Sequence, residues 1–213
     1  NNKIMYSQID VVLLIGGKSS RYNTELKLNE KTAKPKSFHK IQKKYLIIHC
    51  MENFIKYGLF NFILPIGYYK EQFINNFKYV KKIKNRKCNI FYNYSEYIKY
   101  KNNNKLNKDI NILLLKTKKN INKSYRIINV IDKLNLNKLF VSYGDGVGDL
   151  NLKKLYNSTF KTNSIMTVAS INPFSQYGHF YYKKNKVIDF VEKPKLDTWV
   201  NIGYFYINKD AIK

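Results

Sequence analysis

Short apolar runs alternate with amphipathic segments along most of this chain. The apolar runs are rich in β-branched residues, which is typical of buried strands. They cover residues 9–15, 60–66, 110–116, 139–143, 165–171 and 202–207. Segments with helical spacing cover residues 45–57, 71–77, 125–134 and 152–160. This alternation predicts an α/β fold in which a parallel sheet carries helices on its faces.

Polar residues dominate the segments between these elements. We expect loops in three places, at residues 16–36, 101–107 (exposed) and 118–123 (mobile). We also expect a strand at 89–94 and a hairpin formed by 180–182 and 187–191. No repeat or linker interrupts the pattern, so a single domain over residues 1–213 is expected.

The length and the cysteine usage narrow the class of protein further. At 213 residues the chain can bury a sizeable core. It lacks an apolar run long enough to span a membrane, and residues 1–8 do not resemble a signal peptide. Cys50 and Cys88 lie in apolar surroundings, which favours free thiols in a reducing cytoplasm. Because the chain begins without Met and ends where a helix is expected, we interpret it as a fragment that lacks its C-terminal part.

The formal charge of +25 raises the question of nucleic acid or an anionic membrane as a partner. Only three of the 39 basic residues are arginines, and the lysines are scattered along the chain. Base-reading proteins rely on arginine forks and on basic residues gathered on one element. We therefore expect no nucleic-acid or membrane partner, and a basic interaction module remains as an alternative.

The glycine turn after the first strand is the first candidate site. Gly16 and Gly17 follow the apolar run directly, and Arg21, Lys34 and Lys36 add positive charge. Glycine lets backbone N–H groups come close to a ligand, so this segment suits a polyphosphate. It matches neither the dinucleotide fingerprint nor the P-loop, and a plain tight turn is the alternative.

Two further polar motifs also follow predicted strands. Asp145, between two glycines, stands where ligands bind in open α/β sheets, and its carboxylate suits Mg²⁺. The alternative is an Asp that caps a turn, which is our interpretation of Asp149 before the helix at 152. Glu192 and Lys193 could bind hydroxyls and a phosphate, or form a solvated charged turn.

Together, these motifs resemble the sugar-phosphate nucleotidyltransferases, and within them most closely the glucose-1-phosphate cytidylyltransferases. The first part of the resemblance is the segment from Val12 to Arg21 with Lys34-Pro35-Lys36, which resembles G-G-x-G-T-R … P-K. The others are Ile66-Gly67-Tyr68, the Y-G-D-G-V-x-D-x-N pattern at residues 140–151, and E-K-P-K … W-I-N-G-G at residues 192–203. Their order and spacing agree over nearly the whole chain.

The resemblance implies a Rossmann-like three-layer fold with a mostly parallel mixed central sheet. It also implies catalytic roles for Arg21 and Lys36 and a Mg²⁺ ligand in Asp145, with a second metal-binding Asp beyond residue 213. The implied nucleotide-binding residues are Gly16, Gly17, Ser20, Arg126 and Gly144. The implied sugar-phosphate-binding residues are Gly178, Glu192, Lys193 and Asn201. The Lys36 ammonium would neutralise charge on the α-phosphate.

The implied reaction joins a nucleoside triphosphate (NTP), with CTP favoured, to a sugar-1-phosphate, with glucose-1-phosphate favoured. Pyrophosphate is released, and the product would serve cell-surface polysaccharide synthesis in the cytoplasm. The chain departs from the family pattern at Ser19-Ser20, which replace Gly-Thr, and at Ser124-Tyr125, which replace two glycines. A catalytically inactive or regulatory homologue, or an enzyme that uses another NTP, therefore stays open, as does a homo-oligomer.

Overall fold

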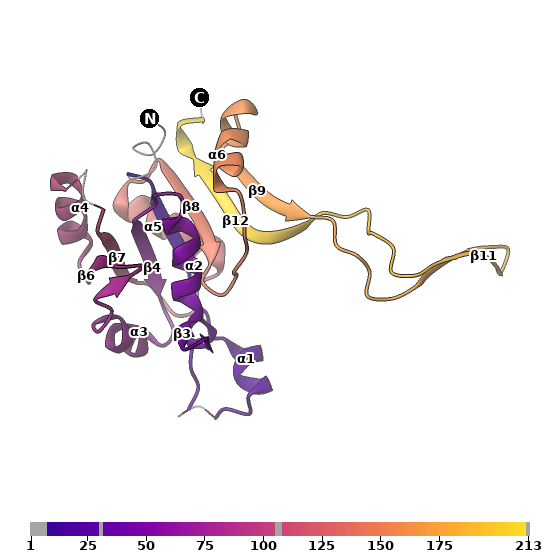
Figure 1. The fold of residues 1–213 in the computed structure, drawn as a ribbon, viewed down its shortest axis with the longest axis horizontal. Coiled ribbons are helices and arrows are strands. Elements are labelled where there is room, and N and C mark those ends of the chain that lie inside the picture. The colour runs from indigo at the N-terminus through magenta and orange to yellow at the C-terminus, as the bar shows by residue number, and fades with distance from the viewer. Residues whose placement is uncertain (1–7, 30–31, 105–107, 212–213) are drawn as a thin grey trace.

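The computed structural model describes residues 8–29, 32–104 and 108–211 and contains one large mixed sheet (Figure 1). Its eight strands lie in the order β5-β6-β7-β4-β1-β8-β12-β9. The five neighbouring strands from β6 to β8 are parallel, and the remaining three pair antiparallel at the two sides. The parallel strands are β6 Arg86–Phe91, β7 Ile110–Lys116, β4 Asn61–Ile66, β1 Asp10–Leu14 and β8 Lys138–Tyr143. The antiparallel strands are β5 Lys82–Ile83, β12 Val200–Asn208 and β9 Met166–Ile171.

Helices cover both faces of this sheet and bury two separate apolar cores. Val11 and Leu13 of β1 belong to the core that also contains residues of α2 Leu46–Ile55, α3 Lys70–Phe77 and α6 Leu152–Lys161. Val12 belongs to the core on the other face, with α4 Tyr94–Asn103 and α5 Lys123–Leu134. Successive strand residues point to opposite faces, so β1 can be buried on both. The predicted three-layer α/β fold with a mostly parallel mixed sheet is confirmed.

The position of β1 in this order determines where a ligand can bind. β1 pairs in parallel with β4 on one side and with β8 on the other, and Leu14 lies opposite Tyr143. The chain reaches β4 through α2, whereas β8 comes much later in the sequence. In open α/β sheets, the point where the strand order reverses in this way carries the ligand site outside the carboxyl ends of the strands.

Three local predictions prove wrong. The expected loop at 101–107 is helical through Asn103, because Lys101 of α4 pairs with the buried Asp10 carboxylate (residues 105–107 lie outside the described residues). The expected loop at 16–36 contains α1 Ser20–Glu25. Asp149 does not cap α6, because Asn151 lies next to the helix and its Oδ1 accepts a hydrogen bond from the Lys154 N–H at 2.9 Å.

The remaining element predictions agree with the structure to within a few residues. The strand expected at 89–94 is β6, which ends at Phe91. Asn93, two residues later, caps the N-terminus of α4. The loop expected at 118–123 is one residue shorter than predicted, because α5 begins at Lys123. Shorter elements complete the chain: η1 Lys36–Phe38, β2 Lys40–Ile41, β3 Lys44–Tyr45 and η2 Lys209–Ala211.

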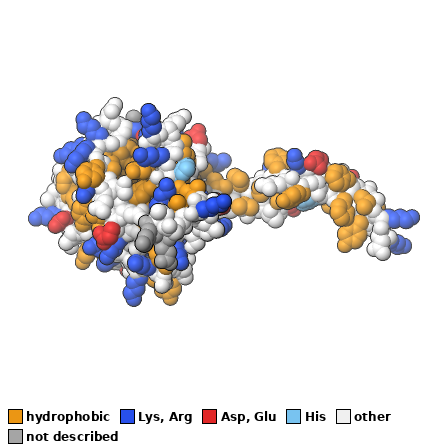
Figure 2. All heavy atoms as spheres, turned by 90° about the horizontal axis from the view of Figure 1, so that it is seen from below, with side chains coloured by type: hydrophobic (Ala, Val, Ile, Leu, Met, Phe, Trp, Pro, Cys, Tyr) orange, Lys and Arg blue, Asp and Glu red, His pale blue; other side chains and the backbone are white. Residues whose placement is uncertain are grey.

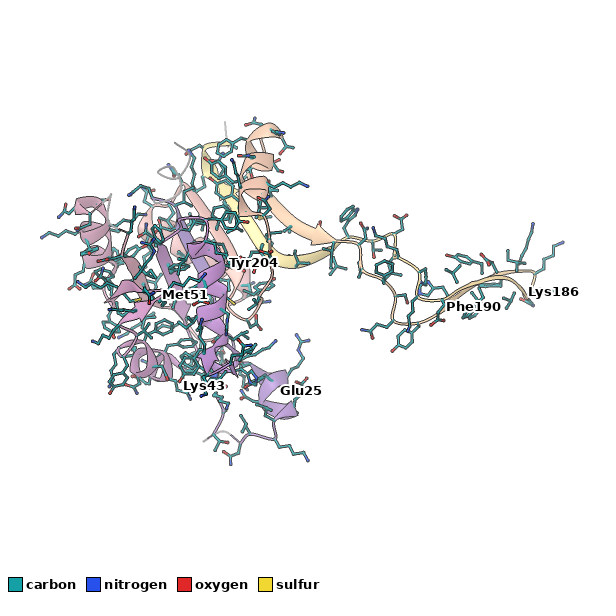
Figure 3. All side chains as sticks on the ribbon, viewed as in Figure 1. Glu25, Lys43, Met51, Lys186, Phe190 and Tyr204 are labelled. Carbon is teal, nitrogen blue, oxygen red and sulfur yellow. The ribbon has the colours of Figure 1, made fainter. Side chains whose placement is uncertain are left out.

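The predicted hairpin is confirmed as β10 His179–Lys183 and β11 Lys186–Val191, and it belongs to an arm that projects from the sheet (Figure 1). We call residues 172–200 the arm. Phe190 and Lys186 lie far along it, well away from Met51 and Tyr204 in the body (Figure 3). Its side chains are mostly solvent-exposed, including Phe180 at 60% and Phe190 at 61%.

The surface and the thiols bear on the compositional predictions. Lys and Arg side chains are dispersed over the face of the body shown in Figure 2, and others lie at the tip of the arm. Cys50 and Cys88 are buried free thiols, as expected. Within residues 8–29, 32–104 and 108–211, no helix is long and apolar enough to cross a membrane.

Candidate functional site

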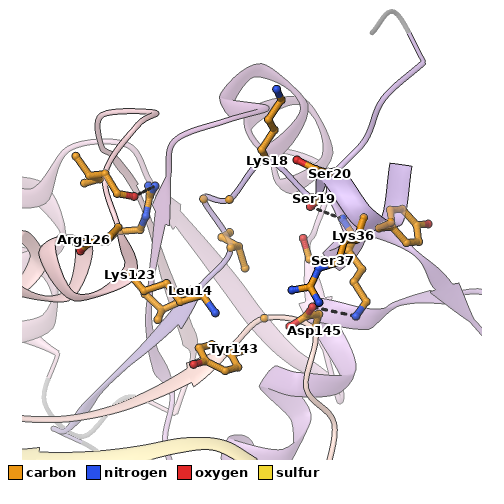
Figure 4. Close-up of a pocket in the computed structure, with 18 of the residues that line it drawn as sticks. Leu14, Lys18, Ser19, Ser20, Lys36, Ser37, Lys123, Arg126, Tyr143 and Asp145 are labelled. Carbon is orange, nitrogen blue, oxygen red and sulfur yellow. Dashed lines mark hydrogen bonds and ion pairs between the residues drawn. The ribbon is translucent and has the colours of Figure 1, made fainter. Parts of the chain in front are cut away.

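A cavity of about 760 Å³ opens at the carboxyl ends of β1 and β8 (Figure 4). Its walls come from the glycine turn, α1, the start of η1, the start of α5 and the turn after β8. Eight residues to which the resemblance assigns a role line it: Gly16, Gly17, Ser20, Arg21, Lys36, Arg126, Gly144 and Asp145. The parallel pairing of β1 with β8 brings the two motifs together, because the carboxyl ends of parallel strands meet at one edge.

The glycines of the cavity differ in what surrounds them. A Cβ on Gly16 would lie 2.3 Å from Arg126 Nη1 and 2.5 Å from the Pro65 carbonyl oxygen. A Cβ on Gly144 would lie 2.1 Å from Ile15 Cγ2, so these two glycines allow close packing within the protein. A Cβ on Gly17 would meet no protein atom within 4 Å. The protein itself therefore does not require a glycine at position 17, and only a ligand in the cavity would require one there.

The segment between Gly17 and Lys36 is held in place by a buried asparagine. Asn23 Oδ1 accepts a hydrogen bond from the Lys34 N–H at 3.1 Å, and Asn23 Nδ2 donates to Tyr69 Oη at 3.0 Å. Tyr69 Oη in turn donates to the Lys18 carbonyl at 2.8 Å. The long connection is thus fastened at both ends and to the start of α3. Nothing in the sequence distinguishes Asn23, because Asn is abundant along the chain.

Ser19, which departs from the family pattern, links the glycine turn to Lys36. Its φ of 53° lies in the left-handed region, where a glycine would be unstrained. Its hydroxyl oxygen accepts a hydrogen bond from the Lys36 N–H at 3.2 Å (Figure 4). The serine therefore adds a tether at a backbone position where glycine would be favoured.

Lys36 and Asp145 form an ion pair in the lining of the cavity. Lys36 Nζ lies 3.2 Å from Asp145 Oδ2, and their side chains are 51% and 37% exposed. Both groups can therefore reach a ligand in the cavity. An ion pair this exposed contributes little to stability, so its geometry matters more for binding than for folding.

The turn that carries Asp145 is held by hydrogen bonds from two side chains. Cys50 Sγ donates a hydrogen bond to the Gly146 carbonyl at 3.3 Å, and Tyr204 Oη donates to the same oxygen at 3.1 Å. Burial, with a smaller contribution from the Asp145 charge, raises the pKa of the Cys50 thiol to about 12, so the thiol stays protonated as a donor. The sequence predicts Cys50 only as a buried thiol, because its contact lies 96 positions away along the chain.

Arg126 lies at the opposite wall and is bound mainly to the protein itself. Its guanidinium donates to Thr117 Oγ1 and to the carbonyls of Lys119 and Ile121, the last two at 3.4 and 3.3 Å. The side chain is only 4% exposed, and burial lowers the pKa of its guanidinium. Arg126 therefore holds the wall formed by residues 117–121, and its nucleotide-binding role stays a prediction.

The residues present can supply part of a Mg²⁺ site. No cluster of three or more His, Cys, Asp or Glu side chains occurs within the described residues. Mg²⁺ is often held by one or two carboxylates together with substrate phosphates, and it retains several waters. Asp145 fits the role of one such carboxylate, because it is partly exposed at the cavity.

The four sugar-phosphate-binding residues that the resemblance implied do not reach this cavity. Gly178, Glu192 and Lys193 lie on the arm, and Asn201 follows it in β12. Gly178 and Glu192 are neighbours, since a Cβ on Gly178 would lie 2.9 Å from Glu192 Oε2. Lys193 Nζ lies 3.9 Å from Glu192 Oε1, and both side chains are more than 60% exposed. The structure thus groups these arm residues with one another and not with the residues of the cavity, and their roles stay predictions.

Comparison with known proteins agrees with this architecture. Two glucose-1-phosphate cytidylyltransferases, from Salmonella typhimurium and Salmonella typhi, are each 27% identical over 94% of this chain and 76% of their own length. Among solved structures, HddC from Yersinia pseudotuberculosis complexed with GMP-PN superposes with a TM-score of 0.56 at 20% identity. A UDP-glucose pyrophosphorylase complexed with UDP-glucose superposes with a TM-score of 0.57 at 18% identity. These matches cover 95% of this chain and 77% and 76% of the two neighbours, and they support the fold.

The family described as nucleotidyl transferase matches residues 10–213, which include β1, the glycine turn, Asp145 and the arm. Its match begins at the first residue of β1 and includes every motif that the sequence singled out. The chain therefore belongs to the nucleotidyl transferase family.

Proposed function

We propose that this protein is a sugar-1-phosphate nucleotidyltransferase that uses CTP and glucose-1-phosphate. The observation that carries the proposal is a cavity in which Gly17, Lys36 and Asp145 meet at the carboxyl ends of β1 and β8. The CTP and glucose-1-phosphate assignment rests on the two Salmonella relatives, at 27% identity.

The reaction transfers a nucleotidyl group in one displacement. A phosphate oxygen of the sugar-1-phosphate attacks the α-phosphorus of the NTP and forms a new P–O bond. The bond from the α-phosphorus to the oxygen that bridges to the β-phosphate breaks, and pyrophosphate leaves with that electron pair. Such a reaction depends on positioning and charge stabilisation more than on covalent catalysis.

The residues of the cavity would divide this work. The backbone at Gly17 and the Arg21 side chain would hold the triphosphate, because one leaves open space and the other adds positive charge to the wall. Lys36 Nζ would offset the charge that develops on the α-phosphate. Asp145 would hold Mg²⁺, which when bound neutralises phosphate charge and orients the phosphates.

The direct test is release of pyrophosphate by the protein in the presence of Mg²⁺ and glucose-1-phosphate. CTP, UTP, dTTP, ATP and GTP are supplied one at a time. Release with CTP alone supports the whole proposal. Release with a different nucleotide retains the reaction and replaces CTP, whereas no release with any nucleotide contradicts it.

A second function is favoured by the placement of the arm. Because Glu192 and Lys193 lie away from the cavity and Ser19 replaces a family glycine, a homologue that binds nucleotides without turnover also fits. This alternative predicts saturable nucleotide binding by titration calorimetry together with no pyrophosphate release from any sugar-1-phosphate tried.

A further inference from the structure

Lys123 is a cation of the cavity wall that the sequence did not single out. It is the first residue of α5 and lines the cavity together with Tyr143, Gly144 and Asp145. Its Nζ lies over the Tyr143 ring, 4.0 Å from the ring centroid (Figure 4). It is thus held close to where a ligand of the cavity must lie.

The ring under Lys123 is itself fixed by the last strand of the sheet. Gly203 has a φ of 83°, and a Cβ there would lie 2.6 Å from Tyr143 Cδ2, so the ring packs directly against the β12 backbone. The Phe205 ring packs edge-on against the Tyr143 ring, with 6.2 Å between the two ring centroids. A flexible lysine lying over such a fixed ring is restricted in the directions it can take, which lowers the entropy lost when it binds an anion.

Stability of the helix does not account for a lysine at this place. A cation at the first turn is unfavourable to the helix dipole, whereas one at the last turn is favourable. Lys133, in the last turn of the same helix, has the favourable placement and lies 5.9 Å from the Tyr94 ring. Within the part of the chain that the structure describes, no carboxylate forms an ion pair with Lys123, whereas Lys36 is paired with Asp145.

We propose that Lys123 is a nucleotide-binding residue whose ammonium donates a hydrogen bond to a phosphate oxygen of the NTP. The inference rests on the proposed function, since it requires a nucleotide in the cavity. It adds a cation on the Tyr143 side of the ligand, which complements Arg21 and Lys36 on the other side. The triphosphate would then be bound by positive charge from both walls, and Tyr143 would position Lys123 without touching the phosphate.

The experiment compares Lys123→Gln with Lys133→Gln by titration calorimetry with the five NTPs. Both substitutions remove an exposed lysine of α5 whose ammonium lies over a tyrosine ring. Only Lys123 lines the cavity. Loss of a charge-assisted hydrogen bond should weaken binding by Lys123→Gln about tenfold. Lys133→Gln should bind like the unmutated protein, and Lys123→Arg should retain most of the affinity because it keeps the cation.

Ionic strength separates lost charge from lost packing. If Lys123 binds a phosphate, added salt should weaken binding by the unmutated protein more steeply than binding by Lys123→Gln. Unchanged affinity of Lys123→Gln, or a loss with the same salt dependence as the unmutated protein, overturns the role of Lys123 and leaves the proposed function intact. No binding of any NTP by the unmutated protein overturns both.

Discussion

The cavity and the arm both carry motifs that follow predicted strands, but the structure treats them differently. The cavity is formed by segments far apart in the sequence that converge on one edge of the sheet, and Asn23, Cys50 and Tyr204 fasten them. The arm contains one hairpin, β10 and β11, whose strands pair only with each other. An isolated two-stranded hairpin has little stability of its own. A motif therefore becomes part of a site only where strand pairing brings a second motif to the same edge.

Of the substitutions that test the cavity, Lys36→Ala should have the largest effect. Loss of the ammonium that offsets α-phosphate charge should lower turnover by about 10²–10³-fold. The side chain is half exposed, so the variant should fold normally. Steady-state pyrophosphate release measures the effect, with Lys40→Ala as a control because Lys40 is an exposed lysine outside the cavity lining. Turnover equal to that of the unmutated protein would contradict the role of Lys36.

Alanine substitutions at Gly16 and Gly17 separate packing from binding within the same turn. Gly16→Ala should destabilise the fold by about 1–3 kcal/mol, because its Cβ would overlap Arg126 and Pro65. Gly17→Ala should leave stability unchanged and weaken nucleotide binding, because only a ligand would occupy the space its Cβ enters. Urea unfolding and titration calorimetry measure the two effects. The interpretation fails if Gly17→Ala binds nucleotide normally or if both variants unfold alike.

Lys193→Met tests whether the arm takes part in the reaction at all. If Lys193 binds the sugar phosphate, the KM for glucose-1-phosphate should rise about tenfold while nucleotide affinity stays constant. Lys186→Met, at the far end of the arm, is the matched control. An unchanged KM would contradict the role of Lys193 in binding the sugar phosphate and would leave the roles of the cavity residues untouched.

The smallest expected effect concerns Ser19, for which two substitutions have different consequences. Ser19→Ala removes the hydrogen bond to the Lys36 N–H and retains the left-handed strain, so turnover should fall a few-fold. Ser19→Gly removes the same bond but relieves the strain, so it should be more stable than Ser19→Ala by about 1 kcal/mol. Kinetic assays and urea unfolding on both variants measure this. Equal stability of the two variants would show that the position is unstrained.

The sequence predicted the sheet and most helices well because their signal is local. Alternation and helical spacing are properties of neighbouring residues, and β7 begins and ends at the residues expected. Where the prediction failed, a distant partner decided the outcome. Lys101 looked like part of a polar loop, yet its ammonium pairs with Asp10 at the start of the chain and keeps α4 helical.

The candidate site divides in the same way. The sequence by itself determined the fold class, the family and the residues of the glycine turn and the Asp145 turn, because short motifs carry them in order. Only the tertiary structure decided that Lys36 faces Asp145, that Arg126 fills the space beside Gly16, and that Gly178 and Glu192 lie on a separate arm. Those outcomes depend on which strands pair and on side chains that meet across many residues of chain, and neither is encoded in any local stretch of sequence.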